Sequence, residues 1–530
     1  MQFKCSEKRL IFYFHVDTRM SNWTSGYVAD IGYTYGYYTE LAPNRATLAF
    51  LNAGYAPPSS GVHCELGFGQ GLSVNIHAAS SDSTWYANDF NPSQAAFAQS
   101  LASTSGTDAH LTDEAFSDFC NRSDLPDFDS IGLHGIWSWI SDENRSIIVD
   151  FIRRKLKIGG VLYISYNTQP GWAAFAPMRH LMTEHASVMG ASGKGVVSRV
   201  DGALEFAQKL LDTNPLFAKA NPSVVDRLKK VASQDRHYLA HEYFNKDWHP
   251  MHFATMSQWL SPAKIDFACS ANYYDHVSAV NLSAEQQALL NEITDPTFKE
   301  SVRDFMVNQQ FRKDYWIKGP RKLSVTEQTE LLNQHKLMLV SARENISLKI
   351  SGSLGEANLS EAVYIPILDL MSDHKVRSIQ EITLKVQDKS ISFAQVVQAT
   401  MVLVGAGQMA SVQSDEQIAK AKLTSSMLNK ALMEKARFSS EISFLASPVT
   451  GGGIVVNRFQ QLFLLSMSQG KQLPEDWAND VWAVLSSQNQ RLVKEGKTLE
   501  SVGENLQELR NQAIEFANKR LPILKALEIV

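Results

Sequence analysis

The sequence predicts an α/β protein in which a mostly parallel sheet carries helices on both faces. Short apolar runs alternate with helix-like stretches between residues 62 and 167, a pattern typical of parallel sheets built from strand–helix–strand units. The first apolar run ends in Glu65 and the alternating glycines Gly67, Gly69 and Gly71. Glycine turns of this kind let a ligand lie against the backbone.

Composition predicts a soluble, multidomain protein. The chain has 530 residues, of which 44% are hydrophobic and 20% are charged, and this length corresponds to three or four domains of about 150 residues each. No apolar run approaches the ~18 residues of a spanning helix, so we expect no membrane span. The net charge of −5 argues against general nucleic-acid binding. Four cysteines without CxxC spacing predict a reducing, cytoplasmic environment.

The elements of the fold can be placed along the chain. Candidate strands cover residues 61–66, 83–88, 130–133 and 160–166, and residues 265–269 read as a strand that could rejoin the same sheet. The basic cluster between Arg312 and Lys322 is interpreted as a solvated surface or linker. We predict a disordered leader (1–24), a core (25–171), a helical insertion that returns to the sheet (172–280), connecting helices (281–319), a winged-helix-like middle domain (320–415) and a helical C-terminal domain (416–530).

The glycine turn excludes two nucleotide classes. Leu72 stands where G-x-G-x-x-G needs its third glycine, and no G-x-x-x-x-G-K-[ST] occurs in the chain, which argues against dinucleotides and nucleoside triphosphates. The spacing E-x-G-x-G-x-G instead resembles the first motif of class I methyltransferases. This resemblance implies S-adenosylmethionine as the cofactor, held at Glu65, Gly67, Gly69 and Gly71.

Carboxylates follow at regular intervals. Asp89 ends the next apolar run, 24 residues after Glu65, where a carboxylate can accept hydrogen bonds from both ribose hydroxyls. Another 24 residues on, Asp113 and Glu114 lie in a segment that resembles the one that meets adenine, and Asp113 is favoured. The alternative for these acidic residues is a capping or turn role.

Polar and aromatic residues follow the last two strands of the core. Ligands of open α/β sheets bind at the carboxyl ends of the strands. We therefore expect His134 and Trp137 to border the methionine end of the cofactor or the methyl acceptor, and Tyr166 to touch the acceptor. A buried aromatic anchor is the alternative for Trp137 and for Trp139.

The motifs together resemble bacterial methyltransferases that carry a methyltransferase regulatory domain, among them the rickettsial lysine methyltransferases that act on outer-membrane proteins. The resemblance implies a Rossmann-like S-adenosylmethionine-binding core and a helical cover that can mediate homodimer formation. It also implies a C-terminal domain that helps to hold a protein substrate. An aromatic segment ahead of the core corresponds to the tyrosines up to Tyr38, of which Tyr37 or Tyr38 is the candidate to fold over the cofactor and a packing role is the alternative. The similar stretches are residues 65–67, 133–139, 166–172, 238–244, 250–253, 302–305 and 445–451.

The leading hypothesis is a methyltransferase that acts on a lysine side chain of a protein, an outer-membrane or surface protein among the candidates. One alternative is a small-molecule methyltransferase. Another is a regulatory protein that senses S-adenosylmethionine and binds DNA, although residues 393–404 contain no Lys or Arg. His237 and His241 have zinc-ligand spacing, but Asn245 replaces the second histidine of H-E-x-x-H, so no metal site is predicted.

Overall fold

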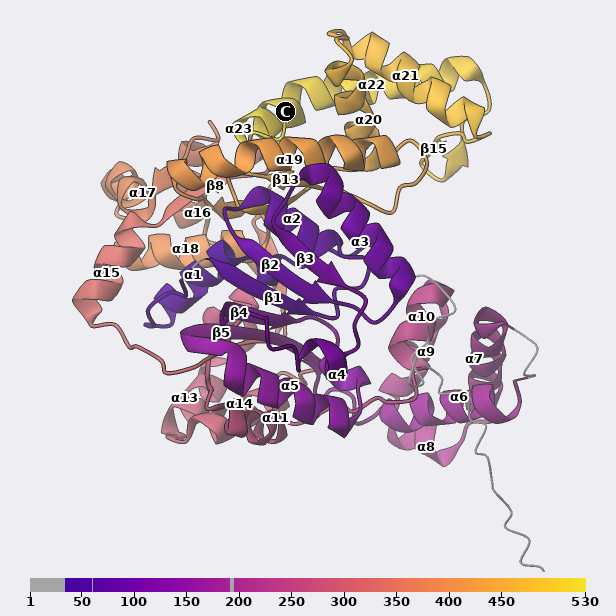
Figure 1. Ribbon diagram of the computed structural model, residues 1–530, viewed down its shortest axis with the longest axis vertical. Coiled ribbons are helices and arrows are strands. Elements are labelled where there is room, and N and C mark those ends of the chain that lie inside the picture. The colour runs from indigo at the N-terminus through magenta and orange to yellow at the C-terminus, as the bar shows by residue number, and fades with distance from the viewer. Residues whose placement is uncertain (1–33, 60, 191–194) are drawn as a thin grey trace, which may run out of the picture.

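A seven-stranded sheet lies at the centre of the protein, in the order β3-β2-β1-β4-β5-β7-β6. The computed structural model describes residues 34–59, 61–190 and 195–530, so the predicted leader lies outside the described residues (Figure 1). The strands are β1 (Val62–Leu66), β2 (Thr84–Asn88), β3 (Ala109–Thr112), β4 (Phe128–Leu133), β5 (Leu156–Asn167), β6 (Asp266–Ser270) and β7 (Phe311–Ile317).

Strand direction separates this sheet from that of dinucleotide-binding proteins. β1 to β5 are parallel, whereas β7 pairs antiparallel with both β5 and β6. The dinucleotide-binding order 3-2-1-4-5-6 has no such antiparallel strand between its fifth and sixth strands. The predicted α/β class, the four predicted core strands and the strand at residues 265–269 are confirmed.

Two strands of this sheet were not predicted. One is β3, and the other is β7, which follows α13 (Ala284–Glu292) and α14 (Pro296–Met306) in the segment expected to hold only connecting helices. The interpretation of Arg312 as a solvated residue is wrong, because Arg312 lies in β7 and is 3% exposed. Its guanidinium can be buried because carboxylates from α14 and from β7 itself pair with it.

Helices cover both faces of the sheet. One face packs against α1 (Pro43–Asn52), α2 (Leu72–Ser80) and α3 (Pro92–Ser105), and the other against α4 (Phe116–Phe119), α5 (Asp142–Lys155) and α11 (Phe253–Leu260). Every residue of α2 is buried, because this helix also contacts the C-terminal elements on its outer side. A helix that is buried all round needs no polar stripe, which explains its largely apolar and small side chains.

Sequence signals fix the ends of the helices nearest the sheet edge. Asn91 caps α3 by accepting a hydrogen bond from Ser93 N, and Pro92 occupies the first turn. Ser141 caps α5 in the same way, with Asp142 and Glu143 in the first turn and basic residues in the last. This charge distribution complements the helix dipole. Both helices therefore begin at defined positions beside the carboxyl ends of the strands.

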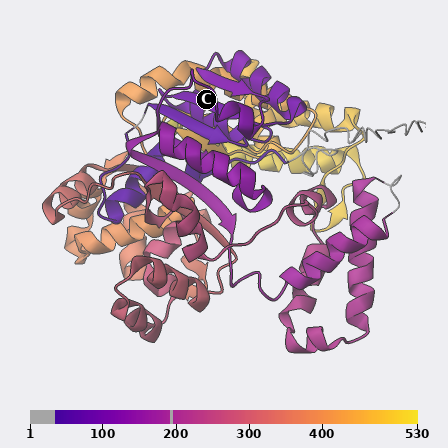
Figure 2. The ribbon, with the colours of Figure 1, turned by 60° about the horizontal axis from the view of Figure 1, so that its bottom comes forward.

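The helical insertion follows β5 and forms an apolar cluster of its own. Its helices stand out to one side of the sheet in Figure 2. They are α6 (Ala176–Val188), α7 (Val196–Asp212), α8 (Leu216–Ala220), α9 (Ser223–Ala232) and α10 (Arg236–Tyr243). The chain then returns through α11, the 3-10 turns η3 (Ser261–Ala263) and η4 (Tyr273–His276), β6 and α12 (Ser278–Asn281) to α13.

The middle region, for which the sequence predicts a winged-helix-like unit, has a small antiparallel sheet of its own with the strand order β11-β8-β12. Its elements are α15 (Val325–Gln334), β8 (Lys336–Leu339), η5 (Arg343–Asn345), the hairpin β9 (Lys349–Gly352) and β10 (Gly355–Asn358), α16 (Glu361–Met371), β11 (Arg377–Ser378), α17 (Ile379–Val386), η6 (Gln387–Lys389), α18 (Phe393–Gly405) and β12 (Met409–Ser411).

The C-terminal region is mainly helical, as predicted, and it lies over α2 and α3 (Figure 1). It comprises α19 (Asp415–Lys435), the hairpin β13 (Phe444–Ser447) and β14 (Gly452–Val455), α20 (Arg458–Ser468), α21 (Pro474–Ser487), the short pair β15 (Val493–Lys494) and β16 (Lys497–Thr498), α22 (Val502–Glu515), a π-helical turn (Phe516–Arg520) and α23 (Leu521–Ala526). Within the described ranges, no helix has both the length and the apolar character needed to cross a membrane.

Candidate functional site

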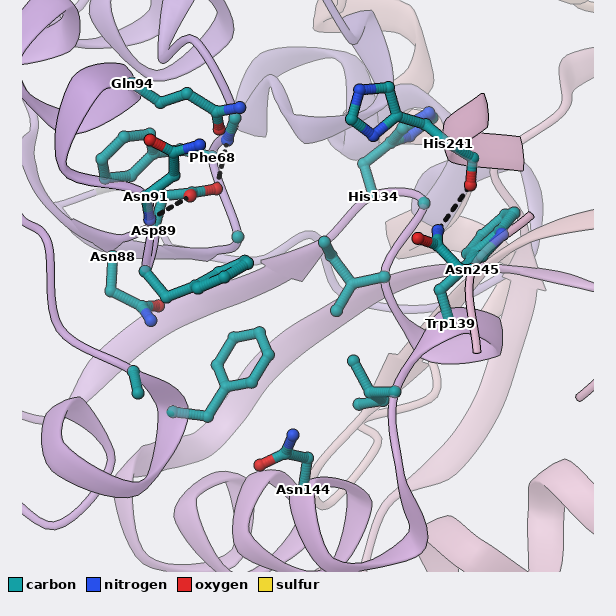
Figure 3. Close-up of a pocket in the computed structure, with 18 of the residues that line it drawn as sticks. Phe68, Asn88, Asp89, Asn91, Gln94, His134, Trp139, Asn144, His241 and Asn245 are labelled. Carbon is teal, nitrogen blue, oxygen red and sulfur yellow. Dashed lines mark hydrogen bonds between the residues drawn. The ribbon is translucent and has the colours of Figure 1, made fainter. Parts of the chain in front are cut away.

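A cavity of about 770 Å³ opens where the carboxyl ends of β1, β2 and β4 meet. The core contributes the glycine turn, the tip of β2, the loops after β3 and β4, and the start of α5. Two distant segments complete the lining, residues 34–38 ahead of the core and residues 241–247 from the insertion. In Figure 3, Asp89, Asn91 and Gln94 lie on one side of this cavity and Trp139, His241 and Asn245 on the other.

The glycine turn between β1 and α2 has a backbone that only glycine adopts easily. Gly67, Gly69 and Gly71 have φ values of 72°, 58° and 69°. A Cβ on Gly67 would come within 2.5 Å of Ile136 Cδ1, and one on Gly71 within 2.4 Å of Ala98 Cβ. Side chains are thus excluded by conformation and by space. At Gly67 and Gly69 the turn consequently presents its backbone to the cavity.

Asp89 is fixed at the tip of β2 by backbone donors. Its Oδ2 accepts a hydrogen bond from Gly69 N at 2.8 Å, and its Oδ1 accepts one from Asn91 N at 3.0 Å. Burial raises the pKa of Asp89 to about 6, although both hydrogen bonds oppose that shift. Each carboxylate oxygen can accept a further hydrogen bond. Asp89 is therefore a preoriented acceptor for two hydroxyl groups.

Two buried oxygens near this turn have no hydrogen-bond partner among the residues that the structure describes, Asn88 Oδ1 and Glu65 Oε2. The Asn88 amide donates to the Glu114 carbonyl at 2.9 Å, and Asn88 lines the cavity. Glu65 lies behind the turn and outside the lining, where burial and then the charge of Asp89 raise its pKa to about 8. A buried acceptor without a partner is costly, so a ligand that donates a hydrogen bond to Asn88 would fit here.

His134 and Tyr38 form an aromatic pair on the lining of the cavity. Their rings stack with centroids 3.6 Å apart and planes 17° apart. The Tyr163 hydroxyl lies 2.7 Å from His134 Nδ1 and fixes the ring, while the backbone N of Tyr38 donates to Ser73 Oγ at 3.2 Å. Burial lowers the pKa of His134 to about 3, so this histidine is neutral at physiological pH. The predicted residues Tyr38, His134, Asp89, Gly67 and Gly69 thus line one cavity, whereas Gly71 and Glu65 lie outside the lining.

The two acidic residues expected near adenine lie elsewhere. Asp113 is exposed and outside the lining, and Glu114 forms an ion pair with Arg122 at 3.1 Å. The lining takes Ala115, Phe116 and Ser117 from the same loop instead. The loop was identified correctly, but its carboxylates point to solvent and to Arg122.

Two expected acceptor residues are core side chains. Trp137 is fully buried, donates its indole N–H to Met251 Sδ at 3.4 Å and lies outside the lining. Trp139, two positions on in the same 3-10 turn, η2 (Trp137–Trp139), lines the cavity. Tyr166 is also fully buried, with its hydroxyl donating to Asp314 at 2.8 Å. The segment predicted through Trp137 reaches the cavity at Trp139, whereas no residue of β5 belongs to the lining, so the prediction for Tyr166 is wrong.

Residues 241–247 were missed as part of the site. His241 is 3% exposed and Asn245 is 2% exposed, and both line the cavity. The Asn245 amide donates to the His241 carbonyl at 2.5 Å (Figure 3). The only sequence signal was the similarity over residues 238–244, which carried no role. In the described part of the chain, no three His, Cys, Asp or Glu residues cluster as metal ligands.

Comparisons with known proteins agree with this geometry. Residues 235–318 match the family described as a predicted methyltransferase regulatory domain. The chain is 41% identical over 512 residues to the uncharacterised protein sll1526 of Synechocystis, covering 96% of this chain and 99% of that protein. It is also 24% identical to protein RP789 of Rickettsia prowazekii over 259 residues, 46% of each chain. The structure of PKMT2 from Rickettsia typhi in complex with AdoHcy aligns with a TM-score of 0.68 at 16% identity, over 93% of this chain and 99% of that one.

The fold and the site define a protein of the class I S-adenosylmethionine-dependent methyltransferase fold that carries a methyltransferase regulatory domain. The chain belongs to the same family as Synechocystis sll1526, which it matches over nearly its whole length. The resemblance stated from the sequence is therefore confirmed at the level of family and fold.

Proposed function

We propose that the protein transfers the methyl group of S-adenosylmethionine to lysine side chains of a protein substrate. The observation that carries the proposal is the Asp89 carboxylate, held by Gly69 N and Asn91 N at the edge of the 770 Å³ cavity. The likeness to a structure determined in complex with AdoHcy, the demethylated form of the cofactor, supports the same choice of ligand.

The lining residues fit the cofactor along its length. Asp89 would accept the ribose hydroxyls, and Asn88 Oδ1 and Phe116 would meet the adenine. The backbone of the turn at Gly67 and the His134–Tyr38 pair would border the methionine end. The buried acceptor on Asn88 is the test of this fit, because a nucleoside supplies the donor that it lacks.

The bound cofactor would supply an electrophilic methyl group on a sulfonium. A lysine ammonium would have to lose a proton before its nitrogen lone pair could take this methyl group, and the electron pair of the broken C–S bond would stay on sulfur. The chain's own residues align the reactants and exclude water. Because His134 is neutral, it places no positive charge beside a cationic sulfonium.

The macromolecular acceptor is supported by the architecture. The middle and C-terminal regions, residues 320–530, add helices and hairpins that the cofactor cavity does not use. We further propose a homodimer formed through the insertion and a cytoplasmic site of action. Buried free thiols at Cys64, Cys120 and Cys269 are compatible with a reducing compartment.

The test is methyl transfer from labelled S-adenosylmethionine to candidate proteins, with modified residues located by mass spectrometry. We expect label on lysine in the presence of wild-type protein. Asp89→Ala should weaken cofactor binding about 10- to 100-fold, the value of one or two hydrogen bonds to a charged group. Asp113→Ala is the matched control and should bind the cofactor normally, because Asp113 is exposed and outside the cavity. Label on small molecules alone would reject a protein acceptor.

A further inference from the structure

We infer that the regulatory domain selects the acceptor, through a wall of five residues that receives a primary ammonium group. This acceptor wall consists of His241, Glu242, Asn245, Lys246 and Asp247. The inference rests on the proposed function and deepens it, because it assigns acceptor recognition to the insertion rather than to the core.

The acceptor wall lies on the side of the cavity away from Asp89. Figure 3 shows His241 and Asn245 beside Trp139, across the cavity from Asp89, Asn91 and Gln94. Asp89 and the glycine turn account for the nucleoside side, so the opposite side is where a second reactant can enter. His134 follows β4 and lines the same cavity, which brings the methyl-donor end within reach of this wall.

The acceptor wall is attached to the loop after β4, which carries His134. His249 N donates to the Ser138 carbonyl at 2.8 Å, and the Trp139 indole N–H donates to the Glu242 carbonyl at 3.5 Å. On its outer side, Arg179 of α6 donates to the Asn245 carbonyl at 2.6 Å. These bonds hold the acceptor wall in a fixed register with the methionine end of the cavity.

Charge favours a cation at the acceptor wall. Its ionised side chains are two carboxylates, Glu242 and Asp247, and one ammonium, Lys246. The wall also begins at the C-terminal end of α10, where the helix dipole is negative. The lining as a whole includes the further carboxylates Asp89 and Glu143, while Lys246 is its only lysine or arginine among the described residues. A lysine ammonium fits this field, whereas an anionic acceptor would be repelled.

The adjacent pair Lys246 and Asp247 provides a sharp test, because their charges are opposite and their positions are nearly the same. The probe is sinefungin, which carries an amino group where the cofactor carries its methyl sulfonium, compared with S-adenosylhomocysteine, which is uncharged there. Dissociation constants of both ligands are measured by calorimetry on the full chain. This readout needs no knowledge of the natural acceptor.

Asp247→Asn and Glu242→Gln should each weaken sinefungin relative to S-adenosylhomocysteine by about fivefold, and Lys246→Gln should tighten it by a similar factor, because each variant removes one unit charge from the lining of the cavity. Glu205→Gln, on the exposed surface of α7, is the matched control and should change neither constant. Equal effects on both ligands, or changes of one sign for Lys246 and Asp247, would overturn the inference. Failure of wild-type protein to bind S-adenosylhomocysteine would instead reject the proposed function.

Discussion

The sheet edge at which β1 to β5 end has two different halves: one borders a cavity, and the other holds a cluster of buried charges. At the ends of β1, β2 and β4 the chain leaves a cavity of about 770 Å³ around Asp89 and His134. At the ends of β5 and β7 it packs a cluster of buried charges, in which Arg312 bonds Asp304 at 2.6 Å and Asp314 at 2.9 Å. Both halves place polar side chains at strand ends, yet only the first has the backbone turn that admits a nucleoside.

The difference teaches that polar residues at a strand end serve two purposes. Asp89 uses backbone donors and keeps acceptor capacity for a ligand. Arg312 is surrounded by Asp304, Asp314 and Glu300, all paired with it. Burial raises the pKa of Asp304 to about 7 even though the guanidinium opposes that shift. The second half therefore joins the sheet to α14.

The largest expected effect comes from breaking the charge cluster. Arg312→Met should lower the free energy of unfolding by about 3–5 kcal/mol, because it leaves buried carboxylates without their cation. Chemical denaturation followed by circular dichroism measures this loss. Arg153→Met is the control, since its ion pair with Asp150 is half exposed and should contribute less than about 1 kcal/mol. A similar small loss for both variants would show that the cluster does not stabilise the sheet.

The next largest effect should come from the glycine turn. Gly71→Ala places a Cβ within 2.4 Å of Ala98 Cβ at a φ of 69°. We expect a loss of about 2–4 kcal/mol from conformational strain and overpacking, together with weaker cofactor binding. Gly106→Ala is the matched control, because Gly106 has a φ of 66° and a Cβ there would meet nothing within 4 Å. Equal losses at the two positions would mean that close packing of the turn is unimportant.

Glu65 predicts a pH dependence of stability in the cofactor half. Its pKa of about 8 in the folded state lies above the ordinary glutamate value of 4.5, so between these pH values the folded state holds a proton that the unfolded state has released. Stability contributed by the protonated carboxyl is present below about pH 4.5 and is lost as the pH rises toward 8. Relative to Glu65→Gln, wild-type protein should lose roughly 3 kcal/mol between pH 5 and pH 8. Parallel stability curves for the two proteins would contradict this assignment.

The smallest expected effect on stability is that of Tyr166→Phe, and comparing it with Tyr38→Ala distinguishes the charge cluster from the cavity. Tyr166→Phe removes one hydrogen bond, to Asp314 at 2.8 Å, and should cost about 1 kcal/mol of stability while leaving methyl transfer intact. Tyr38→Ala removes the ring that stacks on His134 and should reduce transfer. The measurement is the rate of methyl transfer by each variant and by the wild-type protein, at a temperature where all three are folded. A loss of methyl transfer in Tyr166→Phe would show that the Tyr166 hydroxyl takes part in the reaction.

The first half could be predicted from sequence because its signals are local. Glu65, the three glycines and Asp89 lie within 25 residues at the ends of consecutive strands. The second half could not, because Arg312 is stabilised by partners on α14, and a charged strand reads as surface until its partners are known. Tyr166 was misplaced because its hydroxyl is bonded to Asp314 of β7, a partner far along the chain.

The acceptor wall could not be predicted from the sequence, for a related reason. Residues 241–247 reach the cavity only after the insertion has folded into its own apolar cluster. Trp137 and Trp139 both follow β4 and both are buried, and only the completed 3-10 turn decides which of them reaches the cavity. Long-range packing, rather than local propensity, sets these positions.

A crystal structure with bound S-adenosylhomocysteine tests the central claim most directly. The ribose hydroxyls should lie within hydrogen-bonding distance of the Asp89 carboxylate, and the homocysteine end should point toward His134 and Tyr38. Ligand bound instead among Tyr166, Arg312 and Asp314 at the ends of β5 and β7 would contradict it.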